Sequence, residues 1–125
     1  MNHAEDAECI NLMQWVALHL KKYPDLAELF HIPNGGKRGL REAARFKAMG
    51  VAPGIPDYFL PIARDMCYGL WIEMKRPQRD RQRKGSLSAV QADRIDRLTK
   101  AGYLCVVCWG WESARDTLVG YLGDT

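Results

Sequence analysis

The chain has 125 residues, of which 47% are hydrophobic and 26% are charged, and its formal net charge at pH 7 is +3. This length suits one domain, residues 1–125, and the apolar content is enough for a core. No run of about 18 apolar residues is present, so we expect no membrane span. The acidic N-terminal segment lacks the apolar centre of a signal peptide, which predicts a cytoplasmic protein.

The basic residues are concentrated in two segments. Residues 37–47 carry five bases and one acid, and residues 75–84 carry six bases and one acid, whereas residues 1–30 carry five acids and two bases. Two such basic segments indicate a polyanionic partner. A plain solvated surface is the alternative, but the segments flank strands that carry acids, which favours the polyanion.

The cysteines do not favour a zinc or redox protein. In a cytoplasmic protein we expect all four to be reduced thiols. Cys105 and Cys108 form a C-x-x-C pair, but the pair lies in the apolar run 103–111 and is only half a zinc site. We therefore expect two small core side chains. A redox role would require exposed thiols of low pKa.

In chain order, the first predicted element is a helix over residues 5–22, which Tyr23-Pro24 ends. Its inward stripe recurs at helical spacing: Glu5, Cys9, Leu12, Val16 and Leu20. Residues 28–34 predict a short strand that runs into a glycine turn. A basic amphipathic helix over residues 40–50 follows, and Gly50 closes it.

Two strands come next, over residues 57–60 and 68–75, and pairing of the two as a hairpin is plausible. Residues 76–85 are polar and basic, typical of a mobile loop. Ser86 or Ser88 suits the cap of the helix that follows. The remaining elements are a helix, a buried strand and a final helix, over residues 86–102, 103–111 and 112–122. Alternating helices and strands predict an α/β fold around a mixed central β-sheet.

Acidic and basic side chains gather at the predicted hairpin. Asp57 opens one strand, and Glu73 and Lys75 end the next on a shared face. Buried charges are costly unless they pair with one another or share a partner such as a metal ion. Two carboxylates with room for water suit Mg²⁺ or Mn²⁺, and a lysine beside them can offset charge on a phosphate.

The basic segments would hold the rest of a phosphodiester backbone. These residues therefore indicate metal-assisted cleavage of a nucleic acid. The alternative is a buried Asp–Lys–Glu salt network, which would be the better interpretation of an isolated E-x-K.

Pro56-Asp57, followed after fifteen residues by Glu73-Met74-Lys75, resembles the PD-(D/E)xK nuclease superfamily. The surrounding stretches resemble, in order, the VRR-NUC nucleases, in particular the small stand-alone phage type: HIPNGGKR, KAMGVAPGIPDYFLP, GLWIEMKRP, LSAVQ and AGYLCVV. The resemblance covers nearly the whole chain. It implies a restriction-endonuclease-like α/β core and a Mg²⁺- or Mn²⁺-dependent endonuclease that hydrolyses phosphodiester bonds in DNA.

The resemblance also implies roles for individual residues. Asp57 and Glu73 match the metal-binding carboxylates of the family, and the main-chain carbonyl of Met74 would complete the metal ligands. Lys75 matches the catalytic lysine. Gln91 matches a motif glutamine that lies near the active site, although a plain exposed helix residue is the alternative.

The family carries one more acid on its first helix. Counting back from Trp15 favours Glu5 for this position, with Glu8 one turn further on as the contender. Residues expected to contact the DNA backbone come from the glycine turn and the basic segments: Asn34, Gly35, Lys37, Arg38, Arg76, Arg79, Arg81, Arg83 and Lys84.

The resemblance further implies a homodimer that acts on branched DNA such as four-way (Holliday) junctions, in the host cytoplasm if a phage encodes the chain. A dimer would present two active sites to two strands of similar geometry. The alternative is a non-catalytic nucleic-acid-binding module on the same fold. Such a module would have no need of Asp57, Glu73 and Lys75, whose presence argues against it.

Overall fold

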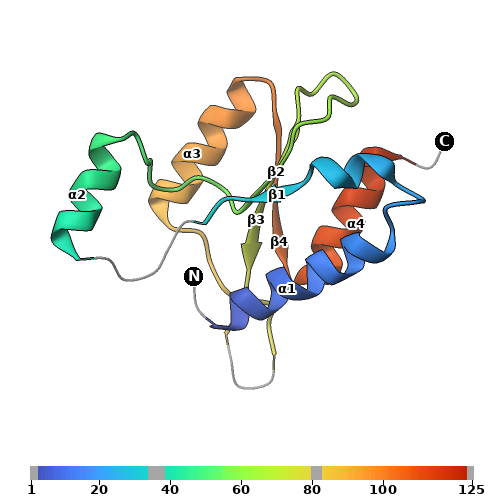
Figure 1. Ribbon diagram of the computed structural model, residues 1–125, viewed down its shortest axis with the longest axis horizontal. Helices are drawn as coiled ribbons and strands as arrows, with labels where there is room; N and C mark the ends of the chain where they lie inside the picture. Colours follow the sequence, from blue (N-terminus) through green and yellow to red (C-terminus); the bar gives the residue numbers. More distant parts are fainter. Residues whose placement is uncertain (1–2, 34–38, 80–82, 124–125) are drawn as a thin grey trace.

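The computed structural model of the chain describes residues 3–33, 39–79 and 83–123, and Figure 1 shows their arrangement. Eight main elements follow one another in the predicted order: α1 (His3–Leu18), β1 (Phe30–His31), α2 (Leu40–Ala48), β2 (Tyr58–Leu60), β3 (Leu70–Lys75), α3 (Ala89–Lys100), β4 (Leu104–Trp109) and α4 (Trp111–Leu122). A short 3-10 helix, Pro24–Glu28, lies between α1 and β1. In these ranges, no helix combines the length and apolar character that crossing a bilayer requires.

The strands form one four-stranded sheet in the order β1-β2-β3-β4. The β1–β2 and β2–β3 pairs are antiparallel, and β3 and β4 are parallel. Figure 1 shows α1 and α4 on one side of this sheet and α2 and α3 on the other. The predicted α/β class, the mixed sheet and the pairing of the two central strands are therefore confirmed.

The main core lies between the sheet and the pair α1 and α4. Alternate residues of β3 point to opposite faces of the sheet. Leu70, Ile72 and Met74 lie in this core and are fully buried. Glu73 and Lys75 therefore point to the other face, which α3 covers in part.

Several element predictions were wrong in detail: the strand predicted over residues 28–34, for example, contains only Phe30 and His31 among the described residues. Helix α1 ends at Leu18 instead of residue 22, and Leu20 is 40% exposed outside it. The His19 amide already bonds back three residues, to the Val16 carbonyl, so the helix tightens into a turn before Pro24. Strand β4 was predicted to be buried, but Leu104 is 38% exposed. Because β4 pairs only with β3 in the described sheet, it is an edge strand.

Candidate active site

Two carboxylates meet across the β2–β3 pair. The pairing aligns Tyr58 with Ile72, and one residue further along the same register places Asp57 opposite Glu73. Both side chains belong to buried residues, with Asp57 at 6% and Glu73 at 3% exposure. The Met74 amide donates a hydrogen bond to Asp57 Oδ2 at 2.7 Å, so the backbone of β3 fixes the Asp57 carboxylate.

Lys75 and Gln91 complete this cluster. The Lys75 ammonium lies 3.8 Å from Glu73 Oε1 and donates a hydrogen bond to Gln91 Oε1 at 2.8 Å. The Gln91 amide nitrogen in turn donates to Glu73 Oε1 at 3.2 Å. The structure thus brings together four predicted site residues in one hydrogen-bonded group: Asp57, Glu73, Lys75 and Gln91.

The start of α3 explains how Gln91 reaches the cluster. Ser88 is the N-cap, and its hydroxyl accepts a hydrogen bond from the Gln91 amide at 3.2 Å. The Gln91 side chain reaches back and accepts from the Ser88 amide at 3.0 Å, which forms a capping box. Gln91 Oε1 therefore serves the helix cap and Lys75 together, a double role that the sequence motif alone did not predict.

The charges of the cluster do not cancel. When both carboxylates are ionised, they and one ammonium leave one negative charge in a buried place, and no described residue donates to Glu73 Oε2. Burial, followed by the negative charge of Asp57, raises the pKa of Glu73 to about 8, while Lys75 opposes the rise. A buried oxygen of this kind favours either a proton or a cation.

A divalent cation fits this donor set. In the described residues, no group of three or more His, Cys, Asp or Glu side chains is arranged to hold a metal. A cation here would rest on two carboxylates, supplemented by a main-chain carbonyl and water. Such oxygen ligands are the ones that Mg²⁺ and Mn²⁺ accept. The Met74 carbonyl remains a predicted ligand.

Of the three acids of α1, the two candidates for the first-helix acid, Glu5 and Glu8, have different surroundings. Glu5 is half-buried, and its negative charge adds to the rise in the pKa of Glu73. Glu8 is buried and bonds elsewhere, to the Trp111 amide at 2.8 Å and to Arg79 Nη2 at 3.1 Å. Glu5 is therefore the acid with a direct electrostatic effect on the cluster, and its assignment as the first-helix acid stays a prediction.

The structure describes four of the nine residues that we expect to contact DNA. Arg76, Arg79, Arg83 and Lys84 lie on the segment that directly follows Lys75, and all but Arg76 belong to exposed residues. Five further predicted contacts lie outside the described residues: Asn34, Gly35, Lys37, Arg38 and Arg81. Helix α2 carries three more exposed bases: Arg41, Arg45 and Lys47. The sequence predicted a polyanion-binding role for their segment, residues 37–47, but not for these residues individually.

The thiols of the C-x-x-C pair are not poised for redox chemistry. Cys108 is buried and Cys105 is half-buried, and all four cysteines of the chain are free. Burial raises the pKa of both the Cys105 and the Cys108 thiol. Cys108 therefore lies in the core, as expected, whereas Cys105 does not, and the raised pKa of both thiols is the opposite of what a reactive thiol requires.

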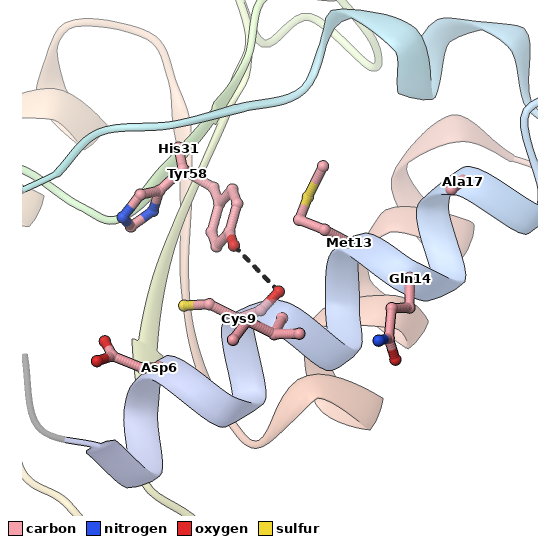
Figure 2. Close-up of a pocket in the computed structure, with 8 residues that line it drawn as sticks. Asp6, Cys9, Met13, Gln14, Ala17, His31 and Tyr58 are labelled. Carbon is pink, nitrogen blue, oxygen red and sulfur yellow. Dashed lines mark hydrogen bonds between the residues drawn. The ribbon is translucent and has the colours of Figure 1, made fainter.

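An apolar groove, which the sequence did not indicate, lies between α1 and the strands β1 and β2. Figure 2 shows its wall on α1, where Cys9 and Met13 lie nearest to Tyr58 and Ala17 lies further along the helix. The Tyr58 hydroxyl donates to the Cys9 carbonyl at 3.4 Å, and burial raises the pKa of the Cys9 thiol to about 11. Apart from Asp6, Gln14 and His31, the described lining is mainly apolar, so the groove is suited to apolar contact.

Comparison with known proteins identifies a close structural relative. A solved structure named "VRR_NUC domain protein" is 32% identical to this chain, covers 99% of this chain and 93% of its own length, and superposes with a TM-score of 0.77. No family model and no curated protein matches the chain.

Proposed function

This chain belongs to the VRR-NUC domain family, and on that premise we propose that it is a Mg²⁺- or Mn²⁺-dependent endonuclease of the PD-(D/E)xK type that hydrolyses phosphodiester bonds in DNA. The observation that carries the proposal is the buried cluster of Asp57, Glu73, Lys75 and Gln91 with its uncompensated negative charge. A salt network with a purely structural role would be expected to balance its charges.

The metal ligands would be Asp57, Glu73 and the main-chain carbonyl of Met74. The bound ion would supply positive charge that offsets the negative charge developing on the scissile phosphate. The Met74 amide already fixes one carboxylate, so the ligands are held in place by the strand itself. Glu5 would add negative charge from α1.

Lys75 would orient the attacking water and share in neutralising the phosphate. Its ammonium is held by Gln91 Oε1 at 2.8 Å, which leaves further N–H groups for a water molecule and a phosphate oxygen. In the reaction, the water oxygen bonds to phosphorus and the P–O ester bond breaks. The water loses a proton and the leaving oxygen gains one, which gives a phosphate monoester and a hydroxyl.

The basic side chains would hold the phosphates on either side of the cut. Arg76, Arg79, Arg83 and Lys84 are close to Lys75 along the chain, so DNA that contacts them would pass next to the acidic cluster. The exposed bases of α2 would add a contact further away.

We extend the proposal to a homodimer that prefers branched DNA such as four-way junctions. The outward side of α1 supports the dimer. Ile10, which is 59% exposed, lines the apolar groove of Figure 2, and Leu18, further along α1, is 82% exposed. A second copy of the chain could cover this apolar surface in a two-fold interface, where the same patch meets itself.

The proposal is tested by cleavage assays on a labelled four-way junction and a linear duplex of matched sequence, with Mg²⁺, Mn²⁺ or EDTA. We expect the wild-type protein to cut the junction faster than the duplex and to lose activity in EDTA. Lys75→Ala should lower the rate at least ~100-fold, because both the water and the phosphate lose a cationic partner.

Lys100→Ala is the matched control, because Lys100 is an exposed α3 lysine paired only with Asp96 in the described structure. It should cut like the wild type. Binding without cleavage under every metal condition would overturn the nuclease proposal. Equal cutting of duplex and junction by a monomeric protein would overturn only the extension to branched DNA and the dimer.

A further inference from the structure

Glu8 is a buried acid that the proposed reaction does not use. Its side chain is only 7% exposed, and a buried carboxylate is costly unless both oxygens find donors. Here both do. Oε1 accepts from the Trp111 amide at 2.8 Å, and Oε2 accepts from Arg79 Nη2 at 3.1 Å. Glu8 therefore joins three segments: α1, the start of α4 and the chain just beyond β3.

The first contact places Glu8 at the end of the strand that carries Lys75. Trp111 is the first residue of α4, where unpaired amides attract a carboxylate, and the N-cap Gly110 provides no side chain of its own. The Gly110 amide donates to the Lys75 carbonyl at 3.0 Å. Two neighbouring amides at the start of α4 therefore bond to Glu8 and to Lys75: the Trp111 amide to the Glu8 carboxylate and the Gly110 amide to the Lys75 carbonyl.

The second contact ties Glu8 to the basic loop, which we define as residues 76–79 and 83–85, the described part of the segment after β3. Arg79 is 57% exposed at its side chain, yet it reaches back to the buried carboxylate. Hydrogen bonds also join the two limbs of the loop, from the Gly85 amide to the Arg76 carbonyl at 2.8 Å and from Arg76 Nε to the Arg83 carbonyl at 2.7 Å. These bonds fix the two described limbs of the loop to each other.

The other limb of the loop has its own anchor. The Trp109 indole donates to the Gly85 carbonyl at 2.6 Å, and the Lys84 ammonium lies 4.0 Å from the centre of the Trp109 ring. Trp109 ends β4 directly opposite Lys75. Glu8 and Trp109 thus hold the two limbs of the basic loop against the end of the sheet at which the candidate active site lies.

We infer that Glu8 is a positioning residue, which holds the basic loop in the shape that binds DNA phosphates beside the candidate active site. This inference rests on the proposed function, and it assigns Glu8 a role different from that of Glu5. Glu8 acts through Arg79 and contacts neither the acidic cluster nor the substrate.

The direction in which Glu8→Gln changes the Kd for DNA distinguishes this positioning role from a purely electrostatic effect of the Glu8 charge. Glu8 is a negative charge beside a cationic loop, so its neutralisation alone should strengthen the attraction of the loop for DNA. Loss of the loop geometry should weaken binding. Glu8→Gln therefore moves the dissociation constant in opposite directions under the two explanations.

The experiment measures binding of a labelled four-way junction and a linear duplex over a range of salt concentrations, with Ca²⁺ to replace the proposed catalytic metal. We expect Glu8→Gln and Arg79→Gln each to raise the Kd about tenfold, since each removes one side of a half-buried charged hydrogen bond. The double variant should bind no worse than the worse single variant, because both act on the same contact.

Asp93→Asn is the matched control. It also removes an acid from an arginine pair, but both Asp93 and Arg97 are exposed on α3, at 65% and 56%. Its Kd should stay unchanged or fall. At saturating DNA, with Mg²⁺ or Mn²⁺, the cleavage rate of Glu8→Gln should stay within about twofold of the wild type, because the cluster of reacting groups is intact.

An unchanged or lower Kd for Glu8→Gln would overturn the inference. So would a collapse of the cleavage rate with an unchanged Kd, which would make Glu8 the first-helix acid of the reaction. If Glu8→Gln fails to fold, Arg79→Lys carries the test, because it keeps the positive charge near the DNA and loses the guanidinium that bonds to Glu8, so an unchanged Kd would overturn the inference. A wild-type protein that never cuts would refute the proposed function, but the binding comparison would still decide the role of Glu8.

Discussion

At the scale of single residues, Glu73 is a buried carboxylate whose ionised form is unfavourable unless a cation binds it. Its Oε2 is buried, no described residue donates to it, and burial together with Asp57 raises its pKa to about 8. In water a glutamate has a pKa near 4.3, so folding of the metal-free protein favours the protonated form. The stability that this proton provides is fully present below the unfolded pKa and is lost as pH rises toward about 8.

Glu73→Gln should therefore stabilise the metal-free protein, and more so at alkaline pH. In EDTA at about pH 8.5 we expect a gain of ~2 kcal/mol in the free energy of unfolding, which shrinks to less than ~1 kcal/mol at about pH 5. Denaturant titrations at the two pH values measure this difference. A gain that is equal at both would contradict the buried, protonated Glu73.

The same variant should lose the response to metal. Mn²⁺ should raise the Tm of the wild type at alkaline pH, since an ion that binds only the folded chain stabilises it. Glu73→Gln should show little or no rise. The exposed variant Asp93→Asn should retain the full rise. A rise that survives in Glu73→Gln would place the ion elsewhere.

At the scale of elements, the first turn of α3 joins helix stability to the candidate site. Gln91 Oε1 accepts from the Ser88 amide at 3.0 Å and from Lys75 at 2.8 Å. The capping box at the start of α3 therefore fixes the position of the Gln91 side-chain amide, which binds the Lys75 ammonium.

Two substitutions should separate these roles. Ser88→Ala should lower the free energy of unfolding by about 1 kcal/mol, the usual loss for a cap, and change cleavage by only a few fold. Gln91→Ala should cause a similar loss of stability and slow cleavage more than tenfold, because Lys75 and Glu73 both lose a partner. Denaturant titration and single-turnover cleavage measure the two effects. Equal slowing by both variants would make the role of Gln91 purely structural.

The same scale shows what the sequence could predict. Helical spacing and turn residues are local signals, and they identified all eight main elements and the pairing of β2 with β3. The motif spacing likewise put Asp57, Glu73 and Lys75 in one place. The end of α1 was not predicted, because it depends on the turn hydrogen bonds that compete with the helix after Leu18. The exposure of β4 was not predicted, because it depends on the position of this strand at the edge of the sheet. The Glu8–Arg79 pair joins residues 71 positions apart, and no local pattern signals such a contact.

At the scale of the whole molecule, the outward side of α1 is the surface on which the proposed dimer depends. Ile10 and Leu18 are exposed there, although apolar residues also cover the inward side of the helix. Exposed apolar residues on a helix whose other side already packs in the core are typical of a surface that a partner covers. In the monomer this helix has solvent on one side, which favours a partner.

Leu18→Glu should convert the wild-type dimer into a monomer, with a Tm that falls only by the amount that dimerisation contributes. Sedimentation at micromolar concentration measures the change. Met66→Glu is the control, because Met66 is a fully exposed apolar residue on the turn between β2 and β3. A dimer that persists in Leu18→Glu would move the interface away from α1, and a monomeric wild type would refute the dimer.

The parallel pairing of β3 and β4 has a consequence for the order in which the molecule folds. Asp57 and Glu73 belong to an antiparallel hairpin that is local in sequence, whereas β4 and the Gln91 helix come later in the chain. Local contacts form before a parallel crossover closes. The two carboxylates should therefore meet while water still surrounds them and lose that water only when the second half of the chain docks. An ion present during synthesis would reach its ligands before the pocket closes.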